Sequence, residues 1–202
     1  MTGADPVGAA EALPARRLTA KGAERRRRIL DAATELLVSE GHAALTLRGV
    51  AARAEIRLGN LQYYFPTRGD LVAALLDRHL VAALDRLRGP LAARDAATLV
   101  RLLLDEHLDR SLTVLFTEVW ALAGHDEGVA VAVRAFYRRY EELVAAAVSG
   151  RRPDLTPTEA AARARVFVSL MEGAALFRSG IAGDPQADSD QLVSSLATGL
   201  LE

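Results

Sequence analysis

The sequence predicts an all-α protein in which a small N-terminal three-helix unit precedes a larger helical bundle. Apolar residues recur every three to four positions from about residue 20 onward, and no segment alternates as a half-buried strand would. Half of the 202 residues are apolar and a quarter are charged, which is the balance of a soluble globular protein. The helical segments are short before Pro66 and long after it. We therefore expect a disordered tail over residues 1–20, a first domain over residues 21–69 and a second domain over residues 70–202.

Three helices are expected in the N-terminal unit. The first covers residues 25–40 and ends at Gly41, because glycine is favoured just after the last turn of a helix. The second begins after Thr46, whose hydroxyl makes it a good N-cap, and it ends near residue 54. A three-residue turn leads to a very short third helix over residues 58–64.

Six longer helices are expected in the second domain. Their predicted ranges are residues 70–88, 96–111, 113–123, 126–149, 158–179 and 189–201. Gly89 and Pro90 are expected to end the first of them, because both residues disfavour a helix interior. The last helix carries one apolar stripe, made of Leu192, Val193, Leu196, Ala197 and Leu200.

The charge distribution is uneven along the chain, although the net charge is only −1. Residues 16–71 carry eleven basic and six acidic residues, whereas residues 72–202 carry fourteen basic and eighteen acidic ones. This pattern indicates a basic N-terminal unit that meets a polyanion. The absence of cysteine excludes disulfides and thiolate metal sites, and no apolar run is long enough to span a bilayer. The N-terminal residues lack the apolar core of a secretory signal, so we expect a cytoplasmic protein with no membrane partner.

A segment of about fifty residues carries a resemblance to a known family. It contains ILDAA and LLVSEG in the first helix, then LTLRGVAARAEI, then GNLQYYFPTRGDL. In order and spacing, residues 25–76 resemble the DNA-binding domain of the tetracycline-repressor (TetR) family. The resemblance implies a helix-turn-helix domain that binds double-stranded operator DNA, and it implies a phosphate-binding cation at Arg68.

The short third helix is suited to the major groove of DNA, with its first residues at base edges. Gly59 permits close approach of the backbone, while Asn60 and Gln62 offer amide groups, and a glutamine can pair with adenine through two hydrogen bonds. The expected DNA-binding residues are Thr46, Arg48, Arg57, Leu58, Gly59, Asn60, Gln62, Tyr63, Tyr64 and Arg68. Tyr64 is equally well explained by core packing. The run from Arg25 to Arg28 is explained either by solvation or by phosphate contact, because four cations at a helix N-terminus oppose the helix dipole.

Three positions depart from the family pattern. Arg57 stands where a serine or threonine usually caps the recognition helix, and Gln62 stands where a tyrosine is common. Gly49 replaces the acidic residue that would complete a capping box after Thr46. These departures weaken the caps and leave the operator sequence open.

The second domain resembles the ligand-binding domain of the same family, and VFVSLMEGAALFRSG is similar to segments of its betaine-type repressors. The residues expected to line a ligand pocket are His107, Phe116, Trp120, Phe136, Tyr137, Tyr140 and Met171. Glu118, Glu172 and His125 are weaker candidates as polar anchors. Each aromatic side chain is also explained by ordinary core packing, because pockets and cores use the same residue types. The last two helices are expected to form a homodimer interface.

No pattern in the chain indicates an enzyme. The four histidines form no metal-binding pair on one helix, and the sequence has neither a glycine-rich phosphate loop nor a nucleophile elbow. We expect no cofactor and no metal, although His107, Glu118 and His125 are ligand types that zinc accepts. Two functions remain. The first is a homodimeric repressor that binds a palindromic operator and is released by a small-molecule effector. The alternative is a DNA-binding protein whose body docks a protein partner and has no such effector.

Overall fold

A computed structural model describes residues 19–93 and 95–202 of the chain. Within these ranges the chain forms nine α-helices and one short 3₁₀ helix, and it contains no strand. The helices are α1 (Ala20–Glu40), α2 (Leu47–Arg53), α3 (Leu58–Tyr64), α4 (Arg68–Ala93), α5 (Ala96–Glu106), α6 (Arg110–Ala123), α7 (Glu127–Arg151), α8 (Pro157–Arg178) and α9 (Ala187–Leu201), with the 3₁₀ helix η1 at His42–Ala44. The predicted all-α class is confirmed. We refer to α1–α3 with η1 as the head and to α4–α9 as the body.

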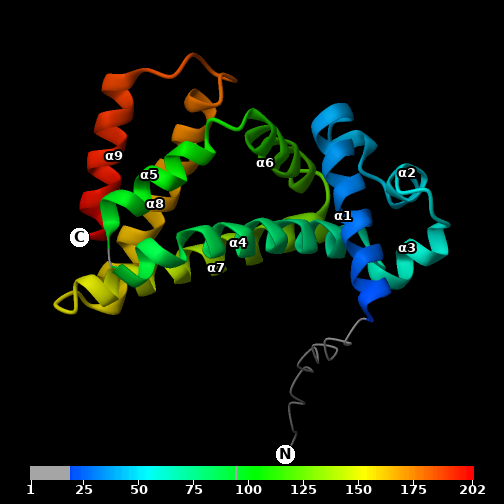
Figure 1. Ribbon diagram of the computed structural model, residues 1–202, viewed down its shortest axis with the longest axis horizontal. Coiled ribbons are helices and arrows are strands. Elements are labelled where there is room, and N and C mark those ends of the chain that lie inside the picture. Colours follow the sequence, from blue (N-terminus) through cyan, green and yellow to red (C-terminus); the bar gives the residue numbers. More distant parts are fainter. Residues whose placement is uncertain (1–18, 94) are drawn as a thin grey trace, which may run out of the picture.

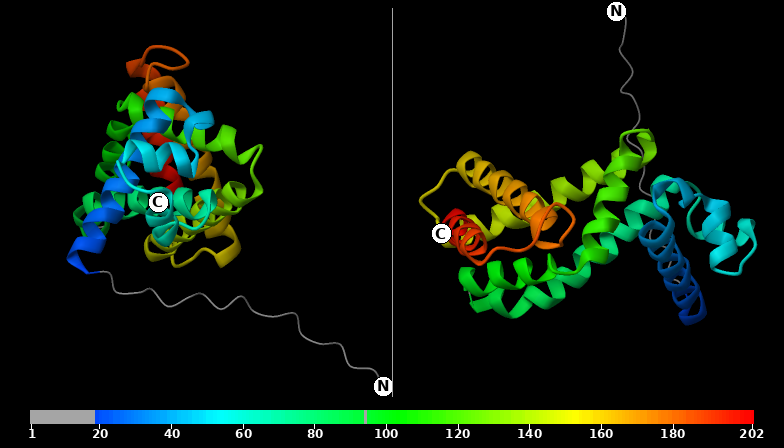
Figure 2. Two further views of the ribbon diagram at one scale, coloured as in Figure 1. Left: turned by 90° about the vertical axis from the view of Figure 1, so that its right-hand side faces the viewer. Right: turned by 90° about the horizontal axis from the view of Figure 1, so that it is seen from above.

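The head lies at one end of an elongated molecule, and α8 and α9 lie toward the other end (Figure 1). Helices α4 and α7 pack against each other and reach from the head into the body. The view from above shows α1–α3 at the end of the molecule opposite α8 and α9, beside the start of α4 (Figure 2). Most of the predicted tail lies outside the described residues, but Thr19 caps α1 and Ala20 is the first residue of that helix.

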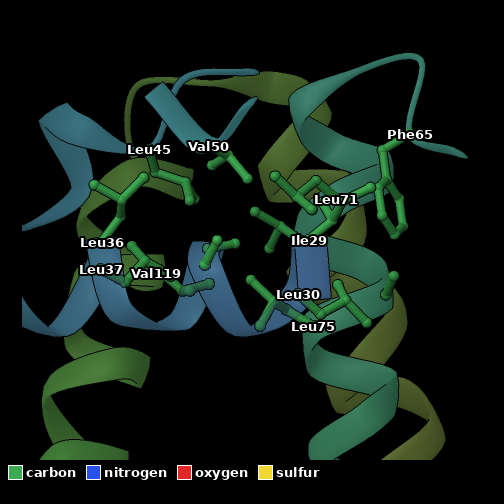
Figure 3. Packing of buried hydrophobic residues seen from close by; sticks show 14 of the residues in the cluster. Ile29, Leu30, Leu36, Leu37, Leu45, Val50, Phe65, Leu71, Leu75 and Val119 are labelled. Atoms are coloured by element: carbon green, nitrogen blue, oxygen red, sulfur yellow. The ribbon is translucent and has the colours of Figure 1, made fainter. Parts of the chain in front are cut away.

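The core of the head extends into the body. Apolar side chains of α1, including Ile29 and Leu37, are fully buried against Leu45 and Val50 (Figure 3). The same cluster continues through Leu71 and Leu75 of α4, Val119 of α6 and Val129 of α7. The packing of the head therefore includes three body helices, so the head does not pack as an isolated unit.

Helix α4 differs from its predicted range at both ends. It begins at Arg68 and continues through Gly89 and Pro90 to Ala93, so the break expected at residues 89 and 90 is wrong. A proline removes one backbone hydrogen bond and its ring crowds the carbonyl four residues earlier, but Pro90 lies in the last turn of α4, with only three helical residues after it. The longer α4 connects the head to the body as one continuous helix.

The boundary between α5 and α6 also differs from the prediction. The expected helix over residues 96–111 ends at Glu106, and α6 begins three residues earlier than predicted, at Arg110. Asp109 explains this start, because its carboxylate accepts a hydrogen bond of 2.9 Å from the N–H of Ser111. Helix α8 begins with a capping box formed by Thr156 and Glu159, which also places its start slightly before the predicted one.

A buried arginine joins α5, α8 and α9 at the far end of the body. Arg178, near the end of α8, donates from Nε to the carbonyl oxygen of Leu104 on α5 at 3.2 Å and forms an ion pair with Asp190 on α9. A second core cluster, which contains Phe167, Met171 and Leu201, connects the same helices. No helix in the described part of the chain is both long and apolar enough to cross a membrane.

Candidate functional site

Helices α2 and α3 present a set of polar side chains to solvent at the free end of the head. Thr46 caps α2 as predicted, since its Oγ1 accepts a hydrogen bond of 2.9 Å from the N–H of Gly49. The predicted DNA-binding residues that are exposed here are Thr46, Arg48, Arg57, Gly59, Asn60, Gln62 and Tyr63. We call these residues the exposed face of α2 and α3. Arg57 precedes α3 without a side-chain cap, as expected for a residue that has replaced serine or threonine.

Two other predicted DNA-binding residues of α3 are only partly accessible. Leu58 is half-buried, and Tyr64 is half-buried against the core of the head. Tyr63 and Tyr64 meet edge to face, with ring centroids 5.2 Å apart. Tyr64 therefore packs in the core and supports the ring of the exposed Tyr63.

Two glycines of the head differ in what surrounds them. A Cβ added to Gly49 would lie 2.7 Å from the backbone carbonyl oxygen of Ala44, a separation that no side chain tolerates. Gly49 does replace the acidic residue of a capping box, as predicted, but an acidic residue would not fit because this position has no room for a side chain. A Cβ added to Gly59 would meet nothing within 4 Å. Packing within the described residues does not require glycine at position 59.

The basic run at the start of α1 has partners inside the protein. Arg27 forms an ion pair with Glu24, and Arg26 lies over the ring of Phe65, 5.3 Å from its centroid. Arg28 donates to the carbonyl oxygen of Ala54 at 3.4 Å, near the end of α2. Three of the four arginines thus contact neighbouring side chains or backbone, while their exposed parts keep this end of the head basic.

The start of α4 is fastened to the start of α7. Arg68 donates from Nε to the carboxylate of Asp126 at 2.9 Å, and this hydrogen bond lowers the pKa of Asp126. Next to this pair, a Cβ on Gly69 would lie 2.7 Å from the carbonyl oxygen of Gly128, so the two helix starts touch backbone to backbone. Arg68, which the family resemblance implied as a phosphate ligand, is engaged with the body in this structure.

Helix α6 makes a second connection between head and body. Oε2 of Glu118 accepts hydrogen bonds from the backbone N–H of His42 at 2.7 Å and lies 2.6 Å from its ring Nδ1. Burial acts to raise the pKa of Glu118, but the hydrogen bonds and charge of His42 outweigh it, so the pKa is lowered. Glu118 is therefore a link to η1 rather than the pocket anchor that the sequence suggested.

A partly open cavity of about 190 Å³ lies among the helices of the body, with side chains from all six of them in the wall. The wall is mainly apolar, and its residues include Leu80, Leu84, Leu103, Leu112, Thr113, Phe116, Trp120, Phe136, Tyr140, Val144, Phe167, Ala175 and Leu201. The ionisable or imidazole side chains in the wall are His79, Arg86, Glu106, His107 and Glu172. The opposite side of α6, at Glu118, contacts the head.

Glu172 is a half-buried carboxyl at the cavity wall, next to a pair of hydrogen-bonded aromatic side chains. The indole N–H of Trp120 donates to the hydroxyl oxygen of Tyr137 at 3.0 Å, and the hydroxyl of Tyr137 donates to Glu172. Burial raises the pKa of Glu172 to about 7, and the hydrogen bond from Tyr137 opposes this rise. Burial also raises the pKa values of Tyr137 and Tyr140, so both hydroxyls stay protonated at neutral pH.

Two histidines at the cavity are uncharged at neutral pH. Burial lowers the pKa of His107 to about 4, helped by the positive charge of Arg178, and burial also lowers the pKa of His79. Nδ1 of His107 and Nε2 of His79 are both buried, and no described residue offers either nitrogen a hydrogen bond. Each imidazole therefore keeps a buried nitrogen that has no hydrogen-bond partner among the described residues.

The structure brings together most of the predicted ligand residues. His107, Phe116, Trp120, Phe136 and Tyr140 line the cavity, together with the weaker candidate Glu172. Met171 is buried in the core and Tyr137 stands behind the wall, so neither lines the cavity as predicted. His79, Arg86 and Glu106 were not predicted from the sequence. The only signal for them was their helical spacing along α4 and α5 relative to the aromatic residues.

A metal site from His107, Glu118 and His125 finds no support in the geometry. Glu118 binds His42 in the head, whereas His107 lies at the cavity. Over residues 19–93 and 95–202, no group of three histidine or acidic side chains is placed to hold a metal ion.

The arrangement as a whole defines a class of protein: a helix-turn-helix unit with an exposed polar face, joined by long helices to a body with an internal cavity. Residues 29–75 match the family model described as bacterial regulatory proteins, tetR family, and residues 92–200 match BetI-type transcriptional repressor, C-terminal. The second match alone spans more than half of the chain. The chain belongs to the TetR family of bacterial transcriptional regulators, as its N-terminal motifs predict.

Individual proteins give the same assignment. The chain is 39% identical, over 126 residues, to an uncharacterised HTH-type transcriptional regulator in the dhlA 5′ region of Xanthobacter autotrophicus. The match covers 58% of this chain and 62% of that relative, so the chain spans less than two thirds of its length. A putative transcriptional regulator from Pseudomonas aeruginosa PAO1 has the same fold, with a TM-score of 0.73, 17% identity and coverage of 92% and 93% of the two chains. The multidrug binding protein EbrR, solved with malachite green, is 26% identical, with a TM-score of 0.64 and coverage of 89% and 99%.

Proposed function

We propose that this chain is a ligand-responsive repressor that binds a palindromic operator as a homodimer and leaves it when a small molecule occupies the cavity. One observation carries the proposal: α4 and α6 each supply residues both to the core of the head and to the wall of the cavity. A ligand in the cavity thus touches the same helices that hold the DNA-binding unit in place.

The exposed face of α2 and α3 is the part that we assign to DNA. Asn60, Gln62 and Arg48 supply the hydrogen-bonding groups that read base edges, whereas Thr46 and Tyr63 are suited to phosphates. The glycine at position 59, which packing does not require, lets the backbone of α3 approach the groove closely. A basic head is also what the polyanionic backbone of DNA attracts.

Helices α8 and α9 supply the surface for a second copy of the chain. Phe177, Leu192 and Leu196 are 61%, 66% and 60% exposed, which is unusual for large apolar side chains, and Val166 is exposed nearby on α8. Two packed helices of this kind pair with their twofold copies in a four-helix interface. The predicted single stripe on α9 is divided: Ala197 is buried within the chain, while Leu192 and Leu196 face solvent.

Release of DNA requires that the ligand prefer one arrangement of the heads. Two recognition helices read successive major grooves only when they are about 34 Å apart, so a small tilt of each head is enough to break the match. A ligand that binds equally well to both arrangements shifts nothing. We expect the ligand to favour the arrangement that does not fit DNA, with a coupling free energy of about 1 to 3 kcal/mol.

Helix α4 is not alone in joining the cavity to the head. Helix α6 also reaches from the cavity wall at Phe116 and Trp120 to the head, through the bonds between Glu118 and His42. Both helices are therefore parts of the proposed switch.

The test begins with selection of bound DNA from a random pool by the full chain. Recovery of a palindrome, followed by titration of that DNA with and without a cavity ligand, measures affinity and the sign of the response. Weaker DNA binding with ligand is the expected result, and tighter binding would make the protein dependent on a co-repressor. The alternative function, a body that docks a protein partner, is disfavoured by the cavity and would be indicated by operator binding that no ligand alters.

A further inference from the structure

The charges around the cavity leave one carboxylate without a cationic partner. Arg86 and Glu106 neutralise each other, with Nε and Oε1 2.8 Å apart. Glu172 receives the hydroxyl of Tyr137, and no basic side chain among the described residues forms an ion pair with it. Because His79 and His107 are uncharged, the wall carries a net negative charge whenever Glu172 is ionised.

Aromatic rings surround the same part of the cavity. Phe116 lies 6.4 Å from Trp120 and 5.7 Å from Phe136, measured between ring centroids, and Phe136 lies 6.3 Å from Tyr140. All four rings line the cavity wall, and for this reason each of them is only half-buried. The faces of aromatic rings attract cations, most strongly where water is excluded.

The size of the cavity limits the ligand. A cavity of about 150 Å³ in another protein is known to hold benzene, and this one measures about 190 Å³. The space therefore suits a molecule of roughly one ring with a short polar substituent. His79 and His107 line this space as uncharged imidazoles, so they add no positive charge to the wall.

We propose that the cavity binds a small organic monocation, an ammonium group on an apolar body of about one ring, with Glu172 as its counter-ion. This inference rests on the proposed function only in treating the cavity as the effector site. An ionised Glu172 repels an anionic ligand, and a neutral ligand leaves its charge without a counter-ion, whereas a cation supplies one. The aromatic rings and the imidazoles give the cavity its shape.

The test compares two probes that differ in one group, benzylammonium and benzyl alcohol, by calorimetric titration of the full chain at pH 8. The wild-type protein is expected to prefer the ammonium by about tenfold or more. In Glu172→Gln the preference should fall to within about threefold, while the exposed control Glu142→Gln on α7 should keep it. Equal binding of the two probes by the wild type, binding of neither, or an undiminished preference in Glu172→Gln would each overturn the assignment.

Two further measurements keep the test decisive. Tyr137→Phe retains the carboxylate but removes its hydrogen-bond donor, so it should weaken ammonium binding at pH 7 and recover much of it at pH 9. Benzyltrimethylammonium has no N–H. It therefore distinguishes a quaternary ligand selected by the rings from a protonated amine that donates a hydrogen bond to Glu172. Tighter binding of either cation than of the alcohol supports the assignment. Operator release by an uncharged molecule alone would preserve the proposed function and overturn this inference. Cation binding without operator release would support this inference and contradict the proposed function.

Discussion

At the scale of single residues, the exposed amides of α3 are the groups best placed to discriminate between base pairs. Gln62 is exposed on the solvent side of α3, whereas its neighbours Leu61 and Phe65 are buried in the core. The side chain therefore contributes nothing to the packing of the head. Its removal tests DNA reading without disturbing the fold.

We expect Gln62→Ala to leave the free energy of unfolding within about 0.5 kcal/mol of the wild type. Binding to the selected operator should weaken by about 1 to 3 kcal/mol, with relaxed preference at one or two base pairs. Repeated selection from a random pool measures this change, and Gln191→Ala on α9 is the control. An unchanged base preference would remove Gln62 from the reading face.

The two glycines of the head make a matched pair. Gly59→Ala should raise the free energy of unfolding by about 0.5 to 1 kcal/mol, because alanine is the better helix former and the site is open. It should nevertheless weaken operator binding, since the added methyl group lies where the groove must approach. Gly49→Ala should lower the free energy of unfolding by about 1 to 3 kcal/mol, because its Cβ would overlap the carbonyl oxygen of Ala44. Chemical denaturation and DNA titration together separate the two cases, and an equal response of both variants would contradict them.

Glu172 makes stability depend on pH. Its pKa is raised to about 7 in the folded protein, so the folded state holds its proton more tightly than the unfolded state does. The free energy of unfolding is therefore reduced as pH rises from about 4.5 to 7, and the full cost is present above pH 7. The groups facing this carboxyl are Tyr137 and Tyr140, whose hydroxyls stay protonated over that range.

Glu172→Gln should consequently be more stable than the wild type above pH 7, by up to about 3 kcal/mol, and similar to it near pH 4.5. Urea denaturation at a series of pH values measures the difference, with Glu142→Gln as the exposed control. A difference that does not change with pH would show that the carboxyl is not buried in the way described.

At the scale of elements, local sequence signals placed the short helices of the head accurately. Thr46, the turn before Leu58 and Pro66 act over three or four residues, and such signals are readable without knowledge of the fold. The errors came where local signals competed with longer-range packing. Pro90 does not end α4, and the break between α5 and α6 was predicted a few residues too late, because Asp109 caps α6 before the expected position.

In the candidate sites too, features set by nearby residues were predictable and contacts with distant segments were not. Residue type and helical spacing were enough to select most of the exposed face of α2 and α3 and most aromatic residues of the cavity. The partner of a polar side chain was not predictable, because it comes from a distant segment. Glu118 binds His42 across 76 positions in sequence, and Arg68 binds Asp126 across 58.

The connection through α6 leads to a prediction for the switch. Glu118→Ala removes both hydrogen bonds to His42 and should lower the free energy of unfolding by about 1 kcal/mol. It should also reduce the difference between operator affinities measured with and without cavity ligand. Glu141→Ala, at an exposed ion pair between α7 and α8, is a control that should leave that difference unchanged. Reduced stability with an unchanged difference would restrict the switch to α4.

At the scale of the whole molecule, α8 and α9 have two functional sides. Phe167, Glu172 and Leu201 face inward to the cavity wall, while Phe177, Leu192 and Leu196 face solvent. A monomer would leave this outer apolar surface in contact with water, which is unfavourable. The double variant Leu192→Asp and Leu196→Asp should therefore sediment as a monomer at micromolar concentration and lose operator binding by more than tenfold. A monomeric wild type at the same concentration would contradict the proposed interface.

The two-sided character of α8 and α9 has a consequence for how the protein would respond to increasing amounts of ligand. In a twofold dimer, each cavity would be separated from the interface by the thickness of these helices alone. Occupation of one cavity would alter the surface offered to the partner, and so the free energy with which the partner's cavity fills. The response would then have a Hill coefficient different from one, and its steepness would be set at the same helices that hold the two copies together.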